Sequence, residues 1–303
     1  MRMPSLRRIV LGFGMGLLLA GAACAEPPTP MLWKVSKGES TVWLLGSMHF
    51  LKDGDYPLSR DVDVAYKDAG KLVFEISPDE LNSPATLALT LQHGMYHDTH
   101  KLQDDLSPTT WQELVAYGEK NNLPAVALQK FEPWMASLTL VALESQKMGM
   151  KPDAGLDMHF MQMASADHKP TGGLETVDQQ LAIFYTSPLK AQQDMLRQSL
   201  DEIGDFPKEM NKEHDTWRRG DSDAMIVAAK KEFAKYPELY QKILAQRNRN
   251  WIPQIERMLV GNDDTLVIVG ALHLAGPDGV VHLLQQKGYT VERICTGCAK
   301  IKH

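Results

Sequence analysis

Two ten-residue stretches of the sequence match each other position by position, and each contains a histidine three residues after a glycine. They span residues 41–50 and 265–274. Each consists of a Thr, four apolar residues, a Gly, a small residue, Met or Leu, the His and a large apolar residue. An apolar run that stops at a glycine, here Gly46 or Gly270, predicts a buried strand followed by a sharp turn or a close backbone approach. We therefore expect His49 and His273 just beyond the carboxyl ends of two strands, where open α/β sheets bind their ligands.

A carboxylate closes a third apolar run, because Glu75 directly follows three apolar residues. Burying a carboxylate is costly unless it is paired or binds a metal. Glu75 follows His49 by 26 residues, the length of one crossover, so both side chains are expected at the same edge of the sheet. His49, His273 and Glu75 together form a predicted ligand set for a divalent metal. The alternative is two histidines with structural partners and a Glu that caps a helix or pairs with an Arg.

A bound metal would supply the chemistry of hydrolysis, because it lowers the pKa of a bound water to roughly 7 in favourable cases. In that scheme Glu75 is either the third ligand or the general base that acts on the water. Histidine and carboxylate ligands suit Mn, Co, Zn or Fe, so the sequence predicts a divalent metal without identifying it.

The sequence resembles the TraB/PrgY/GumN family, which includes the Tiki proteases, in the paired Gly-x-x-His motifs and the Glu between them. The similarity continues through the middle of the chain in the same order and covers most of it. The matching segments are Gly46-Ser47-Met48-His49, Leu72-Val73-Phe74-Glu75, Gly155-Leu156-Asp157, Gly173-Leu174-Glu175-Thr176, Arg247-Asn248 with Trp251, and Gly270-Ala271-Leu272-His273.

This resemblance implies an activity. Tiki members are metal-dependent peptidases and bacterial pheromone-shutdown members act on peptide signals, so it implies a metal-dependent hydrolase, a peptidase, acting on a peptide or another small substrate. The wider superfamily, with erythromycin-esterase-like and ChaN-like proteins, implies an α/β fold with its site at the strand ends. The alternative is a non-catalytic protein of the same fold that binds a peptide or small ligand. A metal or haem carrier similar to the ChaN-like proteins is a third and weaker interpretation.

Four further residues are candidates for supporting roles. Glu175 is a second carboxylate, either a ligand or a proton shuttle, or else a helix-start residue stabilised by the helix dipole. Arg247 stabilises the oxyanion of a tetrahedral intermediate, or forms an ion pair on a helix face. For Asp157 we expect N-terminal capping of an apolar helix. Ser47 has no counterpart in the second motif, where Ala271 takes its place, so a duplicated nucleophile is not expected.

A second group of histidines has a spacing similar to that of a helical zinc-binding motif. His93 and His97 are four residues apart, as in helical zinc peptidases, and His100 follows, but the motif's Glu is missing because Gly94 follows His93. We interpret this segment as a solvated turn at the end of a helix. The remaining isolated histidines are interpreted as structural: His159, His214 and His282.

The elements around these residues predict an α/β fold with a central mixed, partly parallel sheet and a large helical middle segment. Two β-runs, 31–35 and 40–45, form a hairpin. The helix 61–67 and strand 71–76 complete a first βαβ unit, and a strand 265–269, helix 279–286 and strand 289–294 form a second. Between them, residues 84–258 are mostly helical. The helices expected there are 111–120, capped by Ser107, 133–147, 156–166 and 189–203.

Residues 1–25 have the features of an export signal. Arg2, Arg7 and Arg8 precede an uncharged run that ends in Ala23-Cys24-Ala25, a pattern accepted by signal peptidase. The run is too short to span a bilayer. We therefore expect a cleavable signal peptide over 1–25, a single domain over 26–303, and a periplasmic or extracellular protein without a stable membrane anchor. A form lipidated at Cys24 is less favoured, because Gly21 stands where the lipoprotein signal has Leu.

The remaining cysteines and the composition limit the other possibilities. Cys295 and Cys298 are expected to form a local disulfide, since too few residues follow them to build the helix of a thioredoxin-type site. With 44% hydrophobic and 23% charged residues the chain is ordinary globular protein. The net charge of -6, without a Lys/Arg stripe, argues against nucleic acid as a partner.

Overall fold

The computed structural model describes residues 26–37 and 40–298. The predicted signal peptide at 1–25 lies outside the described residues. Within the described ranges, no helix is both long enough and apolar enough to cross a membrane.

A six-stranded mixed sheet forms the centre of the fold, in the order β4-β3-β5-β2-β1-β6. Strands β2, β5, β3 and β4 pair with one another in parallel, whereas β1 is antiparallel to both β2 and β6. The strands are β1 (Leu32–Lys37), β2 (Ser40–Ser47), β3 (Lys71–Phe74), β4 (Thr171–Gly173), β5 (Thr265–Gly270) and β6 (Val291–Arg293). The predicted partly parallel α/β sheet is thereby confirmed.

The hairpin and both crossovers are present, but the crossovers join strands that are not neighbours. β1 and β2 pair from Leu32↔Leu45 to Lys37↔Ser40, as expected for the hairpin. The unit β2-α1-β3, with α1 at Arg60–Asp68, leaves a gap that β5 fills. The unit β5-α14-β6, with α14 at Val280–Gln286, spans β2 and β1. The two ends of the chain are therefore interleaved in one sheet.

The middle of the chain is helical, as predicted, and several helices begin with the same local signal. At Ser77, Ser83 and Ser107 a serine caps the helix and a proline occupies its first position. The helices of this segment are α2 (Pro78–Leu81), α3 (Pro84–Gly94), α4 (Leu102–Asp105), α5 (Pro108–Lys120), η2 (Ala125–Leu128), α6 (Pro133–Lys147), α7 (Leu156–Ala166), α8 (Val177–Tyr185), α9 (Leu189–Glu202), α10 (Phe206–Arg218), α11 (Ser222–Glu232), η3 (Phe233–Lys235), α12 (Pro237–Tyr240), the π-helical turn η4 (Gln241–Ala245) and α13 (Gln246–Leu259).

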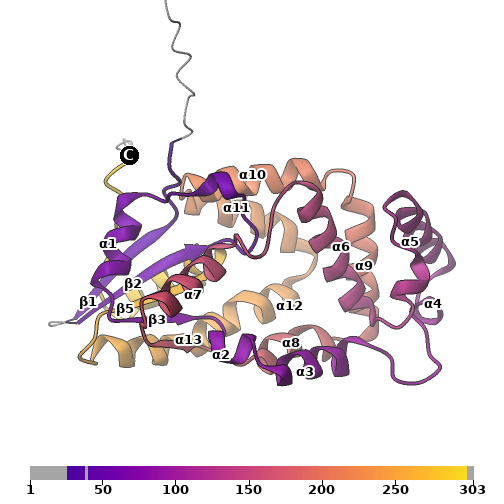
Figure 1. Ribbon diagram of the computed structural model, residues 1–303, viewed down its shortest axis with the longest axis horizontal. Coiled ribbons are helices and arrows are strands. Elements are labelled where there is room, and N and C mark those ends of the chain that lie inside the picture. Colours follow the sequence, from indigo (N-terminus) through magenta and orange to yellow (C-terminus); the bar gives the residue numbers. More distant parts are fainter. Residues whose placement is uncertain (1–25, 38–39, 299–303) are drawn as a thin grey trace, which may run out of the picture.

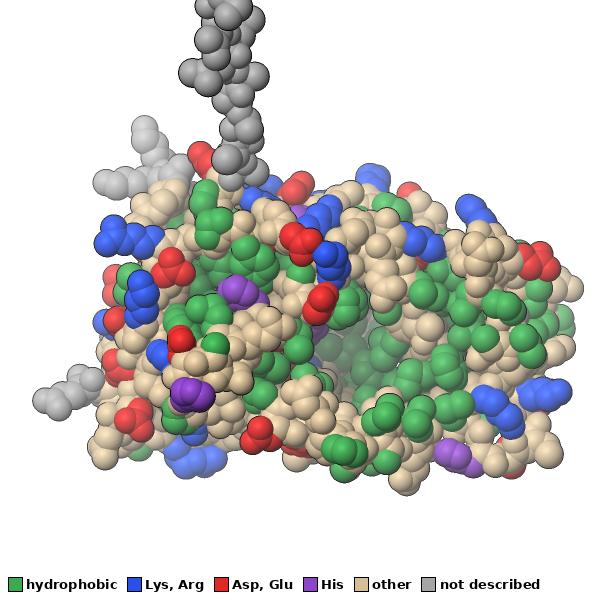
Figure 2. Space-filling model, in the orientation of Figure 1, with side chains coloured by type: hydrophobic (Ala, Val, Ile, Leu, Met, Phe, Trp, Pro, Cys, Tyr) green, Lys and Arg blue, Asp and Glu red, His purple; other side chains and the backbone are tan. Residues whose placement is uncertain are grey.

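Two hydrophobic cores hold these elements together. The larger core surrounds the sheet and includes residues of α1, α7, α13 and α14. A second core lies among α4, α5, α6 and α9, with Leu102, Leu114 and Leu196 fully buried. Figure 1 shows the sheet on the left, with α1 and α7 in front of it, and the second group of helices on the right. The space-filling view is hollowed between the two parts, and apolar side chains line the hollow (Figure 2).

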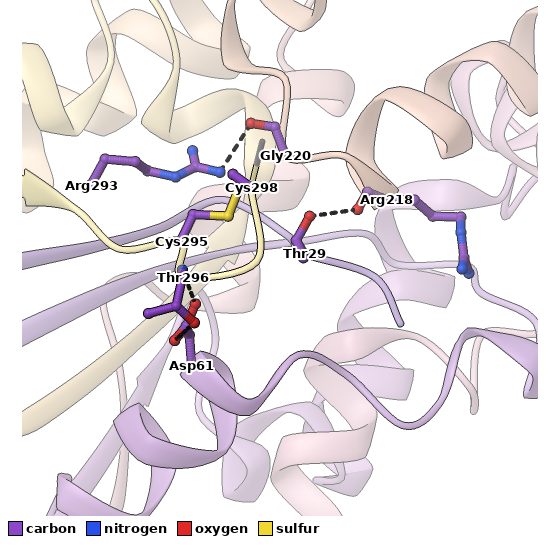
Figure 3. Close-up of a disulfide and its surroundings, with 8 residues drawn as sticks. All are labelled: Thr29, Asp61, Arg218, Gly220, Arg293, Cys295, Thr296 and Cys298. Atoms are coloured by element: carbon purple, nitrogen blue, oxygen red, sulfur yellow. Dashed lines mark hydrogen bonds between the residues drawn. A yellow bond between two sulfur atoms is a disulfide. The ribbon is translucent and has the colours of Figure 1, made fainter. Parts of the chain in front are cut away.

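The C-terminal end of the described chain is fastened to the sheet. Cys295 and Cys298 form a disulfide just after β6. Inside the same turn, the backbone N–H and the hydroxyl of Thr296 donate to Asp61 at the start of α1, at 2.7 and 2.8 Å (Figure 3). Arg293 donates to the carbonyl of Gly220, at 3.0 Å, which ties the end of β6 to the segment after α10.

Candidate functional site

Each of the four neighbouring parallel strands places one chemically active side chain just beyond its carboxyl end. Following the strand order β4-β3-β5-β2, these residues are Glu175, Glu75, His273 and His49. Because parallel strands end at the same edge, all four residues gather there. The predicted location of the two motif histidines and of Glu75 at the strand ends agrees with this topology.

Glycines allow the backbone to pack closely behind these residues. A Cβ on Gly46 would lie 3.0 Å from the backbone of Ala271, so the glycine of the first motif packs directly against the second motif. A Cβ on Gly155 would lie 2.2 Å from the carbonyl oxygen of His49. Side chains at these positions would push the two motifs apart and move α7 away from His49.

Arg247 is the centre of a buried charged cluster. Its side chain extends from α13 and bonds Glu75, Glu175 and His273, in addition to the carbonyl oxygen of Ile243. The Nε–Oε distances to Glu175 are 3.0 and 3.1 Å, and Nη1 lies 3.0 Å from Nε2 of His273. A guanidinium has five N–H donors, and here each has an acceptor. An oxyanion would have to displace one of these acceptors to bind Arg247.

The hydrogen bonds of His273 fix its tautomer. Nδ1 lies 2.6 Å from Oδ1 of Asn248, which can only accept, so this nitrogen carries the proton. Nε2 is then the acceptor for Arg247. Burial, together with the positive charge of Arg247, lowers the pKa of His273 to about 3. His273 is therefore a neutral imidazole at physiological pH.

The two carboxylates of the cluster differ in their pKa shifts. Burial alone would raise the pKa of Glu75, but the neighbouring positive charge of Arg247 and the N–H of Gly270, at 2.7 Å, hold it well below its usual value. Burial raises the pKa of Glu175 in spite of its bonds to Arg247. Gln180 on α8 donates to both carboxylates, at 3.0 and 3.1 Å. Glu75 is thus an ionised carboxylate, clamped on both oxygens.

His49 forms a second, more accessible part of the site. Its Nδ1 lies 2.8 Å from Oδ2 of Asp157 on α7, while Ser47 donates to Oδ1 of the same carboxylate at 2.8 Å. The His49 side chain is 62% exposed, whereas that of Asp157 is only 14% exposed. Asp157 raises the pKa of His49 to about 9. The negative charge of Glu75 also raises this pKa, and the positive charge of Arg247 lowers it. His49 therefore carries a proton at neutral pH. It follows β2, which pairs with β5 beside the buried cluster, with Ser47 opposite Gly270.

The observed arrangement does not fit a metal ion bound by His49, His273 and Glu75 together. No group of three or more His, Cys, Asp or Glu in residues 26–37 and 40–298 is placed to hold one. Arg247 explains this at two of the three positions, because its guanidinium occupies Nε2 of His273 and an oxygen of Glu75. At the third, Asp157 bonds only Nδ1 of His49, so within the described chain this histidine keeps Nε2 as a free ligand atom. The divalent metal remains a prediction from the sequence.

Several interpretations of single residues change with the structure. Asp157 makes no capping bond to α7, so the expected capping role is wrong and the carboxylate instead holds His49 and Ser47. Glu175 and Arg247 bond each other in the buried cluster. The alternatives of a helix-start residue for Glu175 and an ion pair on a helix face for Arg247 do not describe these contacts. Gln180 was not predicted, and no pattern in the sequence marked it.

The other histidines have local partners. α3 ends at Gly94, so His93 and His97 do not lie together on one helix face as in a zinc peptidase. His93 instead stacks on Tyr185. His97 and His100 bond Gln92 and Asp105 respectively. The remaining three contact nearby side chains: His159 packs against the Tyr56 ring in a tilted arrangement, His214 bonds Asp55, and His282 bonds Gln286.

The fold and the site together define an α/β protein with its ionisable groups at the carboxyl ends of adjacent parallel strands. The chain belongs to the TraB/PrgY/gumN family, whose model matches residues 31–293. The resemblance found in the motifs is thereby confirmed.

The similar proteins are themselves uncharacterized. The chain is 22% identical over 268 residues to the uncharacterized protein YbaP of Escherichia coli (strain K12), covering 84% of this chain and 97% of YbaP. YbaP of Shigella flexneri matches to the same extent. An uncharacterized protein of Treponema pallidum (strain Nichols) is 19% identical over 271 residues, covering 85% of this chain and 80% of that protein. No solved structure gives a significant match.

Proposed function

We propose that this protein is an exported hydrolase that cleaves peptide bonds, with His49 as its proton-transfer group. The observation that carries the proposal is the pair of His49 and Asp157, which lies at the functional edge of the sheet beside a buried, fully bonded charged cluster. A histidine oriented by a carboxylate on one nitrogen, with the other nitrogen available to a ligand, is a common device for moving protons in hydrolysis.

The proposed chemistry follows from the charge states of these groups. Asp157 binds Nδ1 of His49 and leaves Nε2 available, since this nitrogen has no hydrogen-bond partner in the described chain. Because His49 is protonated at neutral pH, Nε2–H can donate its proton to the nitrogen that leaves when the peptide bond breaks. The attacking water releases its proton to the solvent, from which the exposed His49 takes up a proton again after each cycle. Asp157 and, more weakly, Glu75 favour the protonated form of His49 through their negative charges, without accepting the proton themselves.

The buried cluster supports this reaction by fixing charge. Arg247, Gln180 and the backbone N–H of Gly270 hold Glu75 ionised and immobile. His273 is held neutral by Asn248 and Arg247, so it leaves the charge balance of the cluster unchanged. Fixed charges next to a reacting bond need no reorganisation during the reaction, which is the main source of electrostatic catalysis.

Export is part of the same proposal. The predicted signal at 1–25 and the disulfide between Cys295 and Cys298 both favour an oxidising compartment outside the cytoplasm. Fractionation of cells that express the full chain, followed by mass determination of the protein, tests this. A mature protein that begins at Glu26 in the exported fraction agrees with it, and an unprocessed cytoplasmic protein contradicts it.

The activity is tested with a defined peptide library and mass-spectrometric detection of cleavage. Wild type is compared with His49→Gln, and His97→Gln serves as the control because His97 is an exposed histidine that bonds only Gln92. We expect cleavage by wild type and the control and a loss of at least 100-fold in His49→Gln, the typical contribution of a proton-transfer group. Absence of cleavage by wild type, or equal cleavage by all three proteins, contradicts the proposal. Binding of a peptide without cleavage favours the non-catalytic binding protein.

A further inference from the structure

A large apolar pocket lies among the helices of the molecule and has no part in the chemistry described so far. Its volume is about 350 Å³, within the range of ligand pockets in proteins. It lies among α6, α8, α9 and α12, the elements around the hollow between the two parts of the molecule (Figures 1 and 2). Its apolar walls are formed by Trp134, Phe184, Pro188, Ala191, Met195 and Leu239.

Two helical segments connect this pocket with the site. On α8, Phe184 of the pocket wall follows Gln180 by four residues, so both side chains lie on the same helix face one turn apart. Gln180 donates to Glu75 and Glu175. At η4, Lys242 of the pocket wall directly precedes Ile243, whose carbonyl accepts from Arg247. A molecule in the pocket therefore contacts two segments, α8 and η4, that also contribute groups to the charged cluster.

The walls are suited to a flat or branched apolar group. The fully buried Trp134 stacks on Phe184, with the ring centroids 5.7 Å apart and the planes at 10°, so the Phe184 ring in the pocket wall is held in place. Met195 is an adaptable neighbour that can adjust to side chains of different shapes. Large apolar side chains gain free energy from leaving water for such a surface.

A polar group in the same wall distinguishes a peptide from a simple hydrocarbon chain. Gln192 is only 6% exposed and lines the pocket. Its Nε2 donates to the carbonyl of Ser187, but its Oε1 has no partner among the described residues. A buried acceptor without a donor is costly. A peptide carries N–H donors next to its side chains, whereas an acyl chain carries none.

From these observations we infer that the pocket binds a large apolar side chain of a peptide, Phe or Leu in type. The selection of a substrate for cleavage rests on the proposed function, whereas the binding of the side chain does not require it. The pocket then selects the peptide on which the charged cluster and His49 act.

A variant that fills the pocket tests the inference without disturbing the core. Ala191 is exposed on α9 and lines the pocket, so Ala191→Trp places a large ring in it from the surface. Ala88→Trp on α3 is the matched control, because Ala88 is an exposed helical alanine away from the pocket walls. Circular dichroism and thermal unfolding confirm that both variants fold.

Binding is measured by calorimetry with acetylated, amidated tripeptides that have Phe, Leu or Ala at the centre, using the His49→Ala background so that nothing is cleaved. We expect the Phe and Leu peptides to bind at least 10-fold more tightly than the Ala peptide, and this preference to disappear with Ala191→Trp but not with Ala88→Trp. Equal binding of the three peptides, no detectable binding, or a preference that survives Ala191→Trp overturns the inference.

Cleavage assays separate this result from the proposed function. With an active enzyme, Ala191→Trp raises KM for substrates that have the large apolar residue and leaves kcat nearly unchanged, since the pocket does not contact the reacting bond. If wild type cleaves nothing but the binding preference holds, the proposed function fails while the pocket assignment stands. If wild type cleaves peptides with no preference that depends on Ala191, the pocket assignment fails and the hydrolase stands.

Discussion

Replacing Arg247 tests whether the buried cluster is held together as the structure indicates. In an Arg247→Met variant, two buried carboxylates, Glu75 and Glu175, lose the cation that bonds both of them. Their side chains are each only 8% exposed, so water cannot replace the guanidinium fully. Removing one partner of a buried ion pair costs about 3–5 kcal/mol. We expect a decrease of this size in the free energy of unfolding at pH 7, measured by urea denaturation.

The neighbouring Arg249 provides the matched control. Among the described residues its guanidinium bonds Gln241 and Gln246 at the surface, so Arg249→Met should change the unfolding free energy by less than about 0.5 kcal/mol. The cost of Arg247→Met should also shrink between pH 7 and pH 5, because carboxylates buried without a cation take up protons as the pH falls. The reasoning is refuted if both variants lose the same stability, or if the cost of Arg247→Met grows toward acid.

Three other predictions concern the two motifs. The pair of His49 and Asp157 raises the pKa of His49 to about 9, so it stabilises the fold fully below pH 6.5 and loses this effect as the pH rises through 9. Urea denaturation should therefore show that His49→Gln lowers the free energy of unfolding at low pH and that this loss shrinks as the pH rises through 9. A loss of stability that is independent of pH would contradict this. Gly155→Ala should cost about 1–3 kcal/mol, because its Cβ would meet the carbonyl of His49, whereas Gly204→Ala, which meets nothing within 4 Å, should be nearly neutral. If the metal predicted from the sequence binds, elemental analysis after reloading should find near-stoichiometric metal that drops in His49→Ala and His273→Ala; equal content in all three proteins rules out this ligand set.

Much of the fold could be predicted because its signals are local. Serine followed by proline marks a helix start, and helices such as α6 and α7 have the predicted bounds. The insertion of β5 between β2 and β3 could not be predicted, since it depends on pairing between residues about 200 positions apart, as for Lys71 and Thr265. β4 consists of Thr-Gly-Gly, which carries no apolar run and forms a strand only because it pairs with β3.

The site was predicted where chemistry and repetition coincide. The duplicated motif predicted His49 and His273 as site residues, and the carboxylate after an apolar run predicted Glu75, because both features are visible in short stretches of sequence. The partners were not visible in the same way. Asp157 looked like a capping residue, and only the packing of α7 at Gly155 against the backbone of His49 brings its carboxylate to the imidazole. The bonds of Arg247 to Glu75, Glu175 and His273 likewise depend on three distant segments that meet at one edge of the sheet.

The dependence of peptide cleavage on pH tests the central claim most directly. If His49 donates the proton and Asp157 sets its pKa, kcat/KM of wild type should fall as the pH rises through about 9. In Asp157→Asn, which keeps the shape of the side chain but removes its charge, the midpoint of this fall should move toward 6.5, the ordinary pKa of histidine. A fall with the same midpoint in both proteins, or activity that persists in His49→Gln, would contradict the account.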